Sequence, residues 1–230
     1  MSNIIEIKSL TKHYYSKEKI KVLNKINFKF KKGKIYSLVG PSGSGKSTLL
    51  NLLSLIDRPT SGNIKIDKDN INFDNVSKID QVRANKIGII YQDKNLLSDF
   101  TALENVYIAR LAVDHDKIKA INDSKKIIKK VGLINRINHY PSELSGGEAQ
   151  RIAISRSLIN SPEIILADEP TGNLDHKNAK EIFRILFKLK SKERIIIFAT
   201  HNRYFANMAD CKIQMIDGKM KIINARIRKQ

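Results

Sequence analysis

The sequence has few of the features that mark secreted, metal-binding or membrane-spanning proteins. It contains a single cysteine, Cys211, which excludes an intrachain disulfide and, without a Cys/His cluster, argues against a zinc site. The longest apolar run, Ile195–Ala199, is far shorter than the roughly 18 residues that a transmembrane helix requires. The segment Met1–Glu6 lacks a basic region followed by an apolar one, so we expect no signal peptide. We therefore expect a cytoplasmic protein, attached to a membrane only through a partner.

Acidic residues are scarce relative to basic ones. The chain carries 42 Lys and Arg against 23 Asp and Glu, a formal net charge of +19. Such an excess can indicate binding to nucleic acid or to anionic lipid headgroups. The lysines, however, are scattered through nearly every segment, and the abundance of Lys, Asn and Ile is what a coding bias produces. We interpret the charge mainly as a solvated surface and do not expect nucleic acid to be a partner.

The sequence does contain a complete phosphate-binding loop, G-x-x-x-x-G-K-[ST]. Lys34–Val39 predicts a buried strand before it, and Leu49–Leu53 predicts a helix after it, which is the context that the motif needs. Its glycines let successive backbone N–H groups converge on phosphate oxygens at the positive end of the helix. Lys46 adds a charge near the β- and γ-phosphates, and the Ser47 hydroxyl can ligate Mg²⁺. A glycine-rich turn without a ligand is the alternative, which the completeness of the motif disfavours. The residues expected to bind a nucleoside triphosphate here are Gly40, Pro41, Ser42, Gly43, Ser44, Gly45, Lys46, Ser47 and Thr48.

Strand patterns alternate with helix patterns along the chain. Ile4–Ser9 and Asn24–Phe30 show period-two alternation and predict antiparallel strands. Later strands are expected at Asn63–Asp67, Ile87–Tyr91, Ile164–Glu169 and Arg194–Thr200. Helices are expected from Thr101 to about Ala112, over Ser124–Val131, from Ser145 to about Ile159, and over Asn178–Lys190. The pattern predicts an α/β fold with a largely parallel sheet and a helical insert over residues 93 to about 160.

Polar side chains follow the ends of several predicted strands. Lys46, Gln92, Asp168 and His201 all stand in such positions, where the ligands of parallel sheets bind. Asp168 is placed as a Walker B carboxylate that holds Mg²⁺ directly or through water, and Glu169 can serve as the general base for an attacking water. Two adjacent carboxylates after a strand can also be a helix N-cap, which the complete phosphate loop disfavours.

A second anion site is predicted within Leu144–Arg151. Ser145 and Glu148 have the spacing of a capping box, so Ser145, Gly146 and Gly147 stand at a helix N-terminus, where bare backbone N–H groups attract anions. Two such sites about a hundred residues apart suggest two ligands, or one ligand clamped between two copies of the chain.

These motifs resemble, in this order, the nucleotide-binding subunit of an ATP-binding cassette (ABC) transporter. They are Gly40–Thr48, Gln92, Leu144–Glu148, Ile164–Glu169, Asn173–Asp175 and His201. The match covers essentially the whole chain, and Leu-Ser-Gly-Gly is specific to this class of ATPases. The resemblance implies one domain over residues 1–230, with a RecA-like P-loop NTPase core, an antiparallel β-subdomain and a helical subdomain. It also implies a head-to-tail dimer that holds two molecules of ATP with Mg²⁺.

The resemblance implies individual roles as well. Gln92 would sense Mg²⁺, held with Ser47 and Asp168, and would couple the site to a permease. His201 would contact the γ-phosphate and act in catalysis with Glu169. Asp175 would cross the dimer interface, and Ser145, Gly146, Gly147 and Glu148 would face the phosphate loop of the other chain. Tyr14 would stack on adenine, although from the pattern alone it could equally be an exposed turn residue.

Three further stretches resemble the branch with the lipoprotein-releasing (Lol-type) and macrolide-exporter (MacB-type) ATPases: Asp57–Gly62, Leu103–Val106 and Asp168–Asp175. Lys68, where a turn glycine is usual, and Ala149, where a polar residue is usual, are modest departures. We expect the ATP-hydrolysing subunit of such a transporter, peripheral on the cytoplasmic face of the membrane through its permease. An FtsE-like regulatory ATPase that gates a cell-wall or division machine is the alternative, while a DNA-repair ATPase would need a much longer insert.

Overall fold

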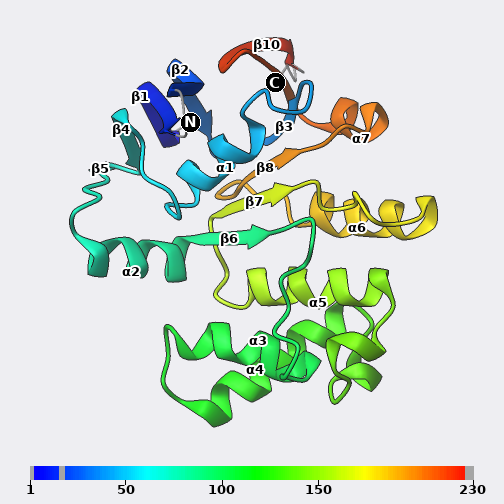
Figure 1. Ribbon diagram of the computed structural model, residues 1–230. Coiled ribbons are helices and arrows are strands. Elements are labelled where there is room, and N and C mark those ends of the chain that lie inside the picture. Colours follow the sequence, from blue (N-terminus) through cyan, green and yellow to red (C-terminus); the bar gives the residue numbers. More distant parts are fainter. Residues whose placement is uncertain (1–2, 16–18, 226–230) are drawn as a thin grey trace. The chain divides into compact units, whose positions relative to one another are not determined.

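The computed structural model describes residues 3–15 and 19–225, which form two compact units (Figure 1). Unit 1 holds the described residues up to Ile79 and again from Lys190, and unit 2 runs from Asp80 to Leu189. Strands alternate with helices in both, so the predicted α/β class is confirmed. No helix within the described ranges combines the length and the apolar character needed to cross a bilayer.

Unit 1 contains an antiparallel sheet of strand order β2-β1-β4-β5. Its strands are β1 (Asn3–Tyr15), β2 (Lys19–Lys31), β4 (Ser61–Ile66) and β5 (Asp69–Asn70). The predicted alternation in β2 is confirmed, because Ile26 and Phe30 are buried, and the ring centres of Phe28 and Phe30 lie 4.6 Å apart. The aromatic rings of this face continue to Tyr36 of the next strand.

Strand β1 is longer than predicted. The sequence suggested a strand that ends at Ser9 and allowed Tyr14 to be an exposed turn residue, but Tyr14 lies in β1, which runs to Tyr15. The reason is a β-bulge: Ser9 has a φ of 48°, and the pairing with β2 shifts register between Ile7 and Leu10. An inserted residue breaks the period-two pattern without ending the strand.

Unit 1 also contains four strands in the order β10-β9-β3-β8. They are β3 (Ile35–Val39), β8 (Ile195–Ala199), β9 (Cys211–Ile216) and β10 (Lys219–Ala225). β3 pairs in parallel with β8 and β9, whereas β10 runs antiparallel to β9. Helices α1 (Lys46–Leu53) and α7 (Arg203–Met208) belong to this unit, and the buried Ser37 hydroxyl of β3 donates to the Ala206 carbonyl of α7 at 2.9 Å. β9, β10 and α7 were not predicted.

Unit 2 combines a parallel strand pair with a group of helices. The strands are β6 (Ile87–Ile90) and β7 (Ile164–Asp168). The α-helices are α2 (Val76–Lys86, which starts in unit 1), α3 (Ala102–Leu111), α4 (Lys117–Lys130), α5 (Gly146–Leu158) and α6 (His176–Lys188), and the 3₁₀ helices are η1 (Ile134–Arg136) and η2 (Pro141–Glu143). Helices α5, α3 and α4 follow one another down the lower part of Figure 1. Val106, Ile128 and Ile152, one from each of them, belong to a single buried hydrophobic cluster. The proposed limits of a helical subdomain, residues 93–160, stay a prediction.

One predicted helix has a different start in the structure, and one helix was not predicted. Helix α4 begins at Lys117 and not at Ser124, because the Asp116 side chain accepts from the Lys119 N–H at 2.9 Å and caps the helix there. Helix α2 was not predicted at all. Of its residues only Ile79 is buried, so no apolar stripe marks it in the sequence.

Candidate functional site

The phosphate loop of unit 1 joins the buried strand β3 to helix α1, as predicted. Gly40 has a φ of 153°, and a methyl group there would overlap the Met215 carbonyl oxygen. Gly45 has a φ of 95° and caps α1, and a methyl group on it would lie 2.8 Å from the Leu23 side chain. Both positions therefore require glycine for conformation and for space.

The interior of the loop fits an anion. Lys46 is buried, and its Nζ donates to the carbonyls of Gly40 and Pro41 at 2.9 Å each. The Ser44 Oγ is buried without a hydrogen-bond partner among the described residues. At the start of α1, no side chain caps the helix and no acidic residue stands in the first turn. Phosphate oxygens would satisfy the Ser44 hydroxyl and the first N–H groups of the helix.

His201 follows β8 at the same sheet edge as the phosphate loop. β3 and β8 are parallel, with Leu38 paired to Ala199, so the residues after both strands emerge together. Thr200 is buried and its N–H donates to the Leu38 carbonyl at 3.2 Å, whereas His201 itself is exposed. The predicted edge position of Lys46 and His201 thus agrees with the sheet of unit 1.

Unit 2 places Gln92, Asp168 and Glu169 at one edge of its own strand pair. β6 and β7 are parallel, with Ile90 paired to Ala167, so Gln92 follows one strand and the two carboxylates end the other. Glu169 has a φ of 42°, a left-handed conformation that costs energy in a residue with a side chain. The Gln92 side chain packs against Gly172, where a methyl group would lie 3.0 Å from the Gln92 Nε2.

Helix α5 holds the segment around Gln92 through two side chains that the sequence did not single out. Gln150 is buried and its Nε2 donates to the Tyr91 carbonyl at 3.3 Å. Arg156 donates to the carbonyls of Asn95 and Lys94 at 2.6 and 2.7 Å, and burial lowers the pKa of its guanidinium. Lys94 and Asn95 both have a left-handed φ, which gives no signal in the sequence.

The predicted capping box at the start of α5 is confirmed. The Ser145 Oγ accepts from the Glu148 N–H at 3.3 Å, and the Glu148 carboxylate accepts from the Ser145 N–H at 2.8 Å. Arg136 also donates to this carboxylate at 3.0 Å. The hydrogen bond from the Ser145 backbone, more than any other contact, lowers the pKa of Glu148. Glu148 therefore serves the end of its own helix, whatever else it contacts.

Gly147 is buried, whereas Ser145 and Gly146 are exposed. A methyl group on Gly147 would overlap the side-chain amide of Asn178, which donates to the Asp175 carboxylate. Asp175 caps helix α6, accepting also from the N–H groups of Lys177 and Asn178, and hydrogen bonds from Asn178 lower the pKa of its carboxyl. Within unit 2, Gly147 is therefore a packing residue, and Ser145 and Gly146 are the positions that can face another molecule.

The residues predicted to hold Mg²⁺ do not form a preformed cluster of metal-binding side chains. Among the described residues, no group of three or more His, Cys, Asp or Glu side chains is arranged to bind a metal ion. Ser47 of unit 1 offers a hydroxyl oxygen, and Gln92 and Asp168 of unit 2 offer an amide and a carboxylate oxygen, the kinds of ligand that Mg²⁺ accepts.

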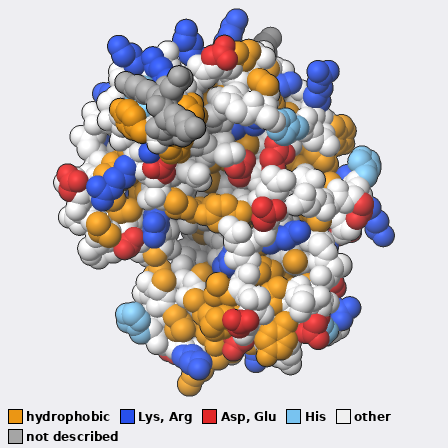
Figure 2. All heavy atoms as spheres, in the orientation of Figure 1, with side chains coloured by type: hydrophobic (Ala, Val, Ile, Leu, Met, Phe, Trp, Pro, Cys, Tyr) orange, Lys and Arg blue, Asp and Glu red, His pale blue; other side chains and the backbone are white. Residues whose placement is uncertain are grey.

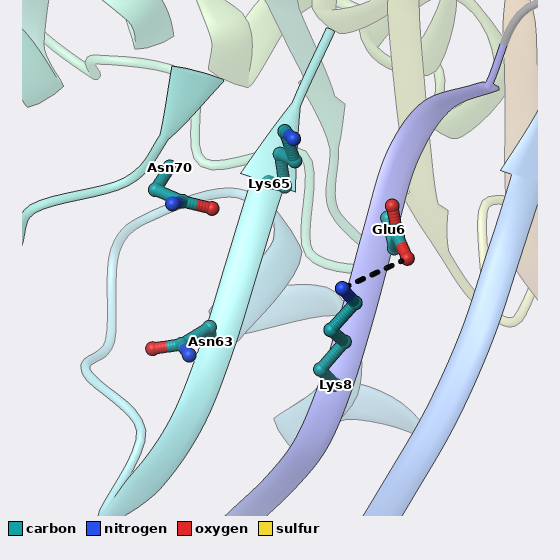
Figure 3. A pocket seen from close by; sticks show the side chains of 5 residues that line it. All are labelled: Glu6, Lys8, Asn63, Lys65 and Asn70. Atoms are coloured by element: carbon teal, nitrogen blue, oxygen red, sulfur yellow. Dashed lines mark ion pairs between the residues drawn. The ribbon is translucent and has the colours of Figure 1, made fainter. Parts of the chain in front are cut away.

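Two other surface features carry no predicted site residue. A polar hollow of about 180 Å³ lies over β1, β4 and β5, lined by Glu6, Lys8, Asn63, Lys65 and Asn70 (Figure 3). The carboxylate of Glu6 is paired there with Lys8 at 3.6 Å (Figure 3). Figure 2 shows Lys and Arg side chains scattered over the visible face, as expected for a solvated surface.

Comparison with known proteins gives concordant matches. The sequence model of the family described as "ABC transporter" matches residues 23–172. The lipoprotein-releasing system ATP-binding protein LolD of Rickettsia typhi (strain ATCC VR-144 / Wilmington) is 43% identical over 223 residues, which cover 96% of this chain and 99% of that protein. LolD of Buchnera aphidicola subsp. Schizaphis graminum (strain Sg) is also 43% identical, over 94% of this chain and 96% of its own.

Solved structures agree. A dimeric structure of the ATP-binding cassette MJ0796 in a post-hydrolysis state, bound to ADP and Pi, has a TM-score of 0.88 and 34% sequence identity, covering 96% of this chain and 100% of its own. The structure of cbiO1 from Clostridium perfringens, part of the ABC transporter complex cbiONQ, has a TM-score of 0.82 and 27% identity, covering 96% of this chain and 88% of its own.

Proposed function

Because this chain belongs to the ABC transporter family and is an ATP-hydrolysing cassette of that family, we propose that it powers a membrane permease of the lipoprotein-releasing type. The observation that carries the proposal is the 43% identity to LolD of Rickettsia typhi, which extends over nearly the full length of both chains. In this role the protein lies on the cytoplasmic face of the membrane, held there by its permease.

We assign nucleotide binding to the loop Gly40–Thr48 and to Tyr14. The glycines and the buried Ser44 hydroxyl support phosphate binding, and Lys46 adds a positive charge beside the β- and γ-phosphates. Ser47, Gln92 and Asp168 are the residues that would hold Mg²⁺, which would supply positive charge to neutralise the phosphates. Tyr14 stacks on the adenine ring.

We assign hydrolysis to Glu169 and His201. Glu169 accepts the proton of the attacking water as the general base, and its strained backbone supports a role beyond folding. His201 is exposed at the edge of unit 1 and donates to the γ-phosphate. Gln92 follows a segment whose carbonyls α5 holds; it would be a ligand of the metal and would report the state of the nucleotide to the permease.

We further propose a head-to-tail dimer in which Ser145 and Gly146 reach the nucleotide of the other chain. The exposure of these two residues at an N-terminus of a helix supports this assignment, as does the dimeric state of MJ0796 in its solved structure. Gly147 contributes by packing against Asn178, and Asp175 lies near the dimer interface.

The catalytic roles are tested with two variants. Glu169→Gln should abolish steady-state hydrolysis but retain ATP binding and accumulate an ATP-bound dimer, because it removes the base and keeps the shape. Lys46→Ala should weaken binding of a fluorescent ATP analogue itself. Glu193→Gln, which changes a carboxylate with a 75% exposed side chain, is the matched control. Near wild-type hydrolysis by Glu169→Gln would remove Glu169 from the catalytic role.

The dimer is tested by cross-linking. Cysteines introduced by Ser42→Cys and Ser145→Cys in the Glu169→Gln background should join two chains when ATP is present. The chain with Cys211 alone is the control, since that thiol is buried. Cross-links confined to one chain would contradict the head-to-tail arrangement. Gly147→Asp is a poor probe of this interface, because its side chain would displace Asn178 within its own chain.

The transport role is tested by reconstituting the chain with its membrane subunits in proteoliposomes that contain a lipoprotein. ATP-dependent release of the lipoprotein by the wild type, and none by the complex with Glu169→Gln, is the expected result. Hydrolysis without release, together with nucleotide-dependent activation of a peptidoglycan hydrolase, would support the regulatory alternative instead.

A further inference from the structure

The turn that follows helix α1 is joined to the end of strand β1 by side-chain hydrogen bonds. The carboxylate of Asp57 accepts from the Tyr14 hydroxyl on Oδ2 at 2.7 Å and from the Lys12 Nζ on Oδ1 at 2.6 Å. Lys12 also donates to the Arg58 carbonyl at 2.7 Å. Each oxygen of this carboxylate therefore holds a different residue of β1.

The same turn also forms hydrogen bonds with the backbone of β1. The Thr60 N–H donates to the Thr11 carbonyl at 2.9 Å, and the His13 N–H donates to the Thr60 Oγ1 at 2.9 Å. Backbone and side-chain contacts of the turn thus hold four consecutive residues of β1, from Thr11 to Tyr14. This accounts for the stretch Asp57–Gly62, which the sequence marks as a family feature but to which it gives no role.

The turn is continuous with the helix of the phosphate loop. The N–H groups of Ile56 and Asp57 donate to the Asn51 carbonyl, in the last turns of α1, at 3.1 and 3.2 Å. Helix α1 starts at Lys46, so the phosphate loop lies at one end of this hydrogen-bonded helix and turn, and Asp57, the anchor of Tyr14, lies at the other. Burial raises the pKa of the Tyr14 phenol, and its hydrogen bond to the Asp57 carboxylate raises this pKa further.

The charges around Tyr14 suit a stacking platform. Burial alone would raise the pKa of Asp57, but hydrogen bonds from Lys12, Tyr14 and the Arg58 N–H outweigh it and lower the pKa. Asp57 is therefore ionised at neutral pH and accepts from both partners. The Lys12 Nζ lies 4.8 Å from the centre of the Tyr14 ring, over one of its faces, while 41% of Tyr14 stays exposed. With one face covered by a cation, a planar ligand can stack only on the other.

We propose that Asp57 is a positioning residue that orients Tyr14 for stacking with the nucleobase, with Lys12 covering the opposite face of the ring. This rests on the role proposed for Tyr14 in nucleotide binding. A tyrosine that is already held before ATP arrives loses less side-chain freedom on binding, which is worth roughly three- to tenfold in affinity. The turn thereby fixes the distance between base recognition and phosphate recognition.

Steady-state kinetics with Asp57→Ala and Tyr14→Phe test the contact from both sides. Each should raise the KM for ATP roughly three- to tenfold with kcat close to wild type, because the base is held less well and the chemistry is untouched. The double variant should be no worse than Asp57→Ala alone, since that substitution already removes the hydrogen bond that Tyr14→Phe removes. Asp69→Ala, which removes an exposed carboxylate from the same unit, is the matched control and should leave KM unchanged.

Tripolyphosphate separates positioning from general support of the fold. It carries the phosphates without a base, so its inhibition constant should be unaffected by Asp57→Ala. An equal loss for ATP and tripolyphosphate would overturn the inference, because the turn would then merely stabilise the phosphate loop. If Asp57→Ala does not fold, Tyr14→Phe tests the same hydrogen bond with the ring intact.

Tyr14→Ala separates this inference from the function on which it rests. An unchanged KM for ATP in Tyr14→Ala would show that the assignment of Tyr14 to the base is wrong. A raised KM in Tyr14→Ala, with wild-type values in both Asp57→Ala and Tyr14→Phe, would leave Tyr14 in place and overturn the role of Asp57.

Discussion

Two glycines of the phosphate loop provide a matched pair of perturbations. Gly40 and Gly43 both have a positive φ, 153° and 77°, but their surroundings differ. A methyl group on Gly43 would meet no atom within 4 Å, whereas one on Gly40 would overlap the Met215 carbonyl oxygen and lie 2.9 Å from the Ser44 Oγ. Alanine at the two positions therefore separates backbone strain from steric overlap.

The expected magnitudes follow from these surroundings. Gly43→Ala should cost about 1–2 kcal/mol, the penalty of a left-handed conformation in a residue with a Cβ. Gly40→Ala causes a similar strain. In addition its methyl group overlaps the backbone of β9 at Met215, and this overpacking adds about 1–3 kcal/mol. For a chain of this length, each kcal/mol corresponds to roughly 2–4 °C in Tm.

Thermal unfolding followed by far-UV circular dichroism in the absence of nucleotide measures the difference, since the chain has no tryptophan to report by fluorescence. Gly40→Ala should melt several degrees below Gly43→Ala. Equal decreases would refute the steric argument, because strain alone would then explain both. A Gly40→Ala chain that melts several degrees below Gly43→Ala but binds ATP as tightly as the wild type would show that the loop can move away from β9 and still bind its ligand.

Two further predictions concern unit 2. Ile152→Ala should lower the free energy of unfolding by about 2–5 kcal/mol, because this side chain is fully buried in the core shared by α3, α4 and α5. Ile118→Ala, at a 75% exposed position, should change it by no more than about 0.5 kcal/mol. Similar Tm values for the two variants would contradict the core assignment. Hydrogen bonds from Thr101 lower the pKa of Glu104 below 4.5, so its charge stabilises the folded chain above that pH and stops doing so as the pH falls through the lowered value. Glu104→Gln, which can keep the capping geometry, should therefore lower Tm most near pH 7 and progressively less toward pH 3, and a pH-independent difference would exclude the charge as the cause.

The sequence was most informative where a local rule fixes the structure. The phosphate loop and the capping boxes at Thr101 and Ser145 depend on residues within a few positions of each other, and all were found. Helix α2 was missed because it buries only Ile79, and β1 was shortened because the bulge at Ser9 hides its period.

Contacts between distant segments could not be predicted. The carboxylate of Asp57 reaches Tyr14 across 43 residues, and Arg156 reaches Lys94 across 62. Nothing in the spacing of these residues reveals such pairs, because only the folded chain brings them together. The packing of Gly147 against Asn178 is also a contact between distant segments. It leaves Gly146, and not Gly147, as the exposed glycine of the stretch Leu144–Glu148.

The left-handed backbone of Glu169 has a consequence for how this chain can evolve or be engineered. Glycine or asparagine would adopt this conformation more cheaply, so selection for heat tolerance alone would favour either residue at this position. Such a chain would be more robust and unable to turn over ATP if Glu169 is the base. On that proposal, the left-handed conformation of Glu169 is a cost in stability that the chain bears for the sake of hydrolysis.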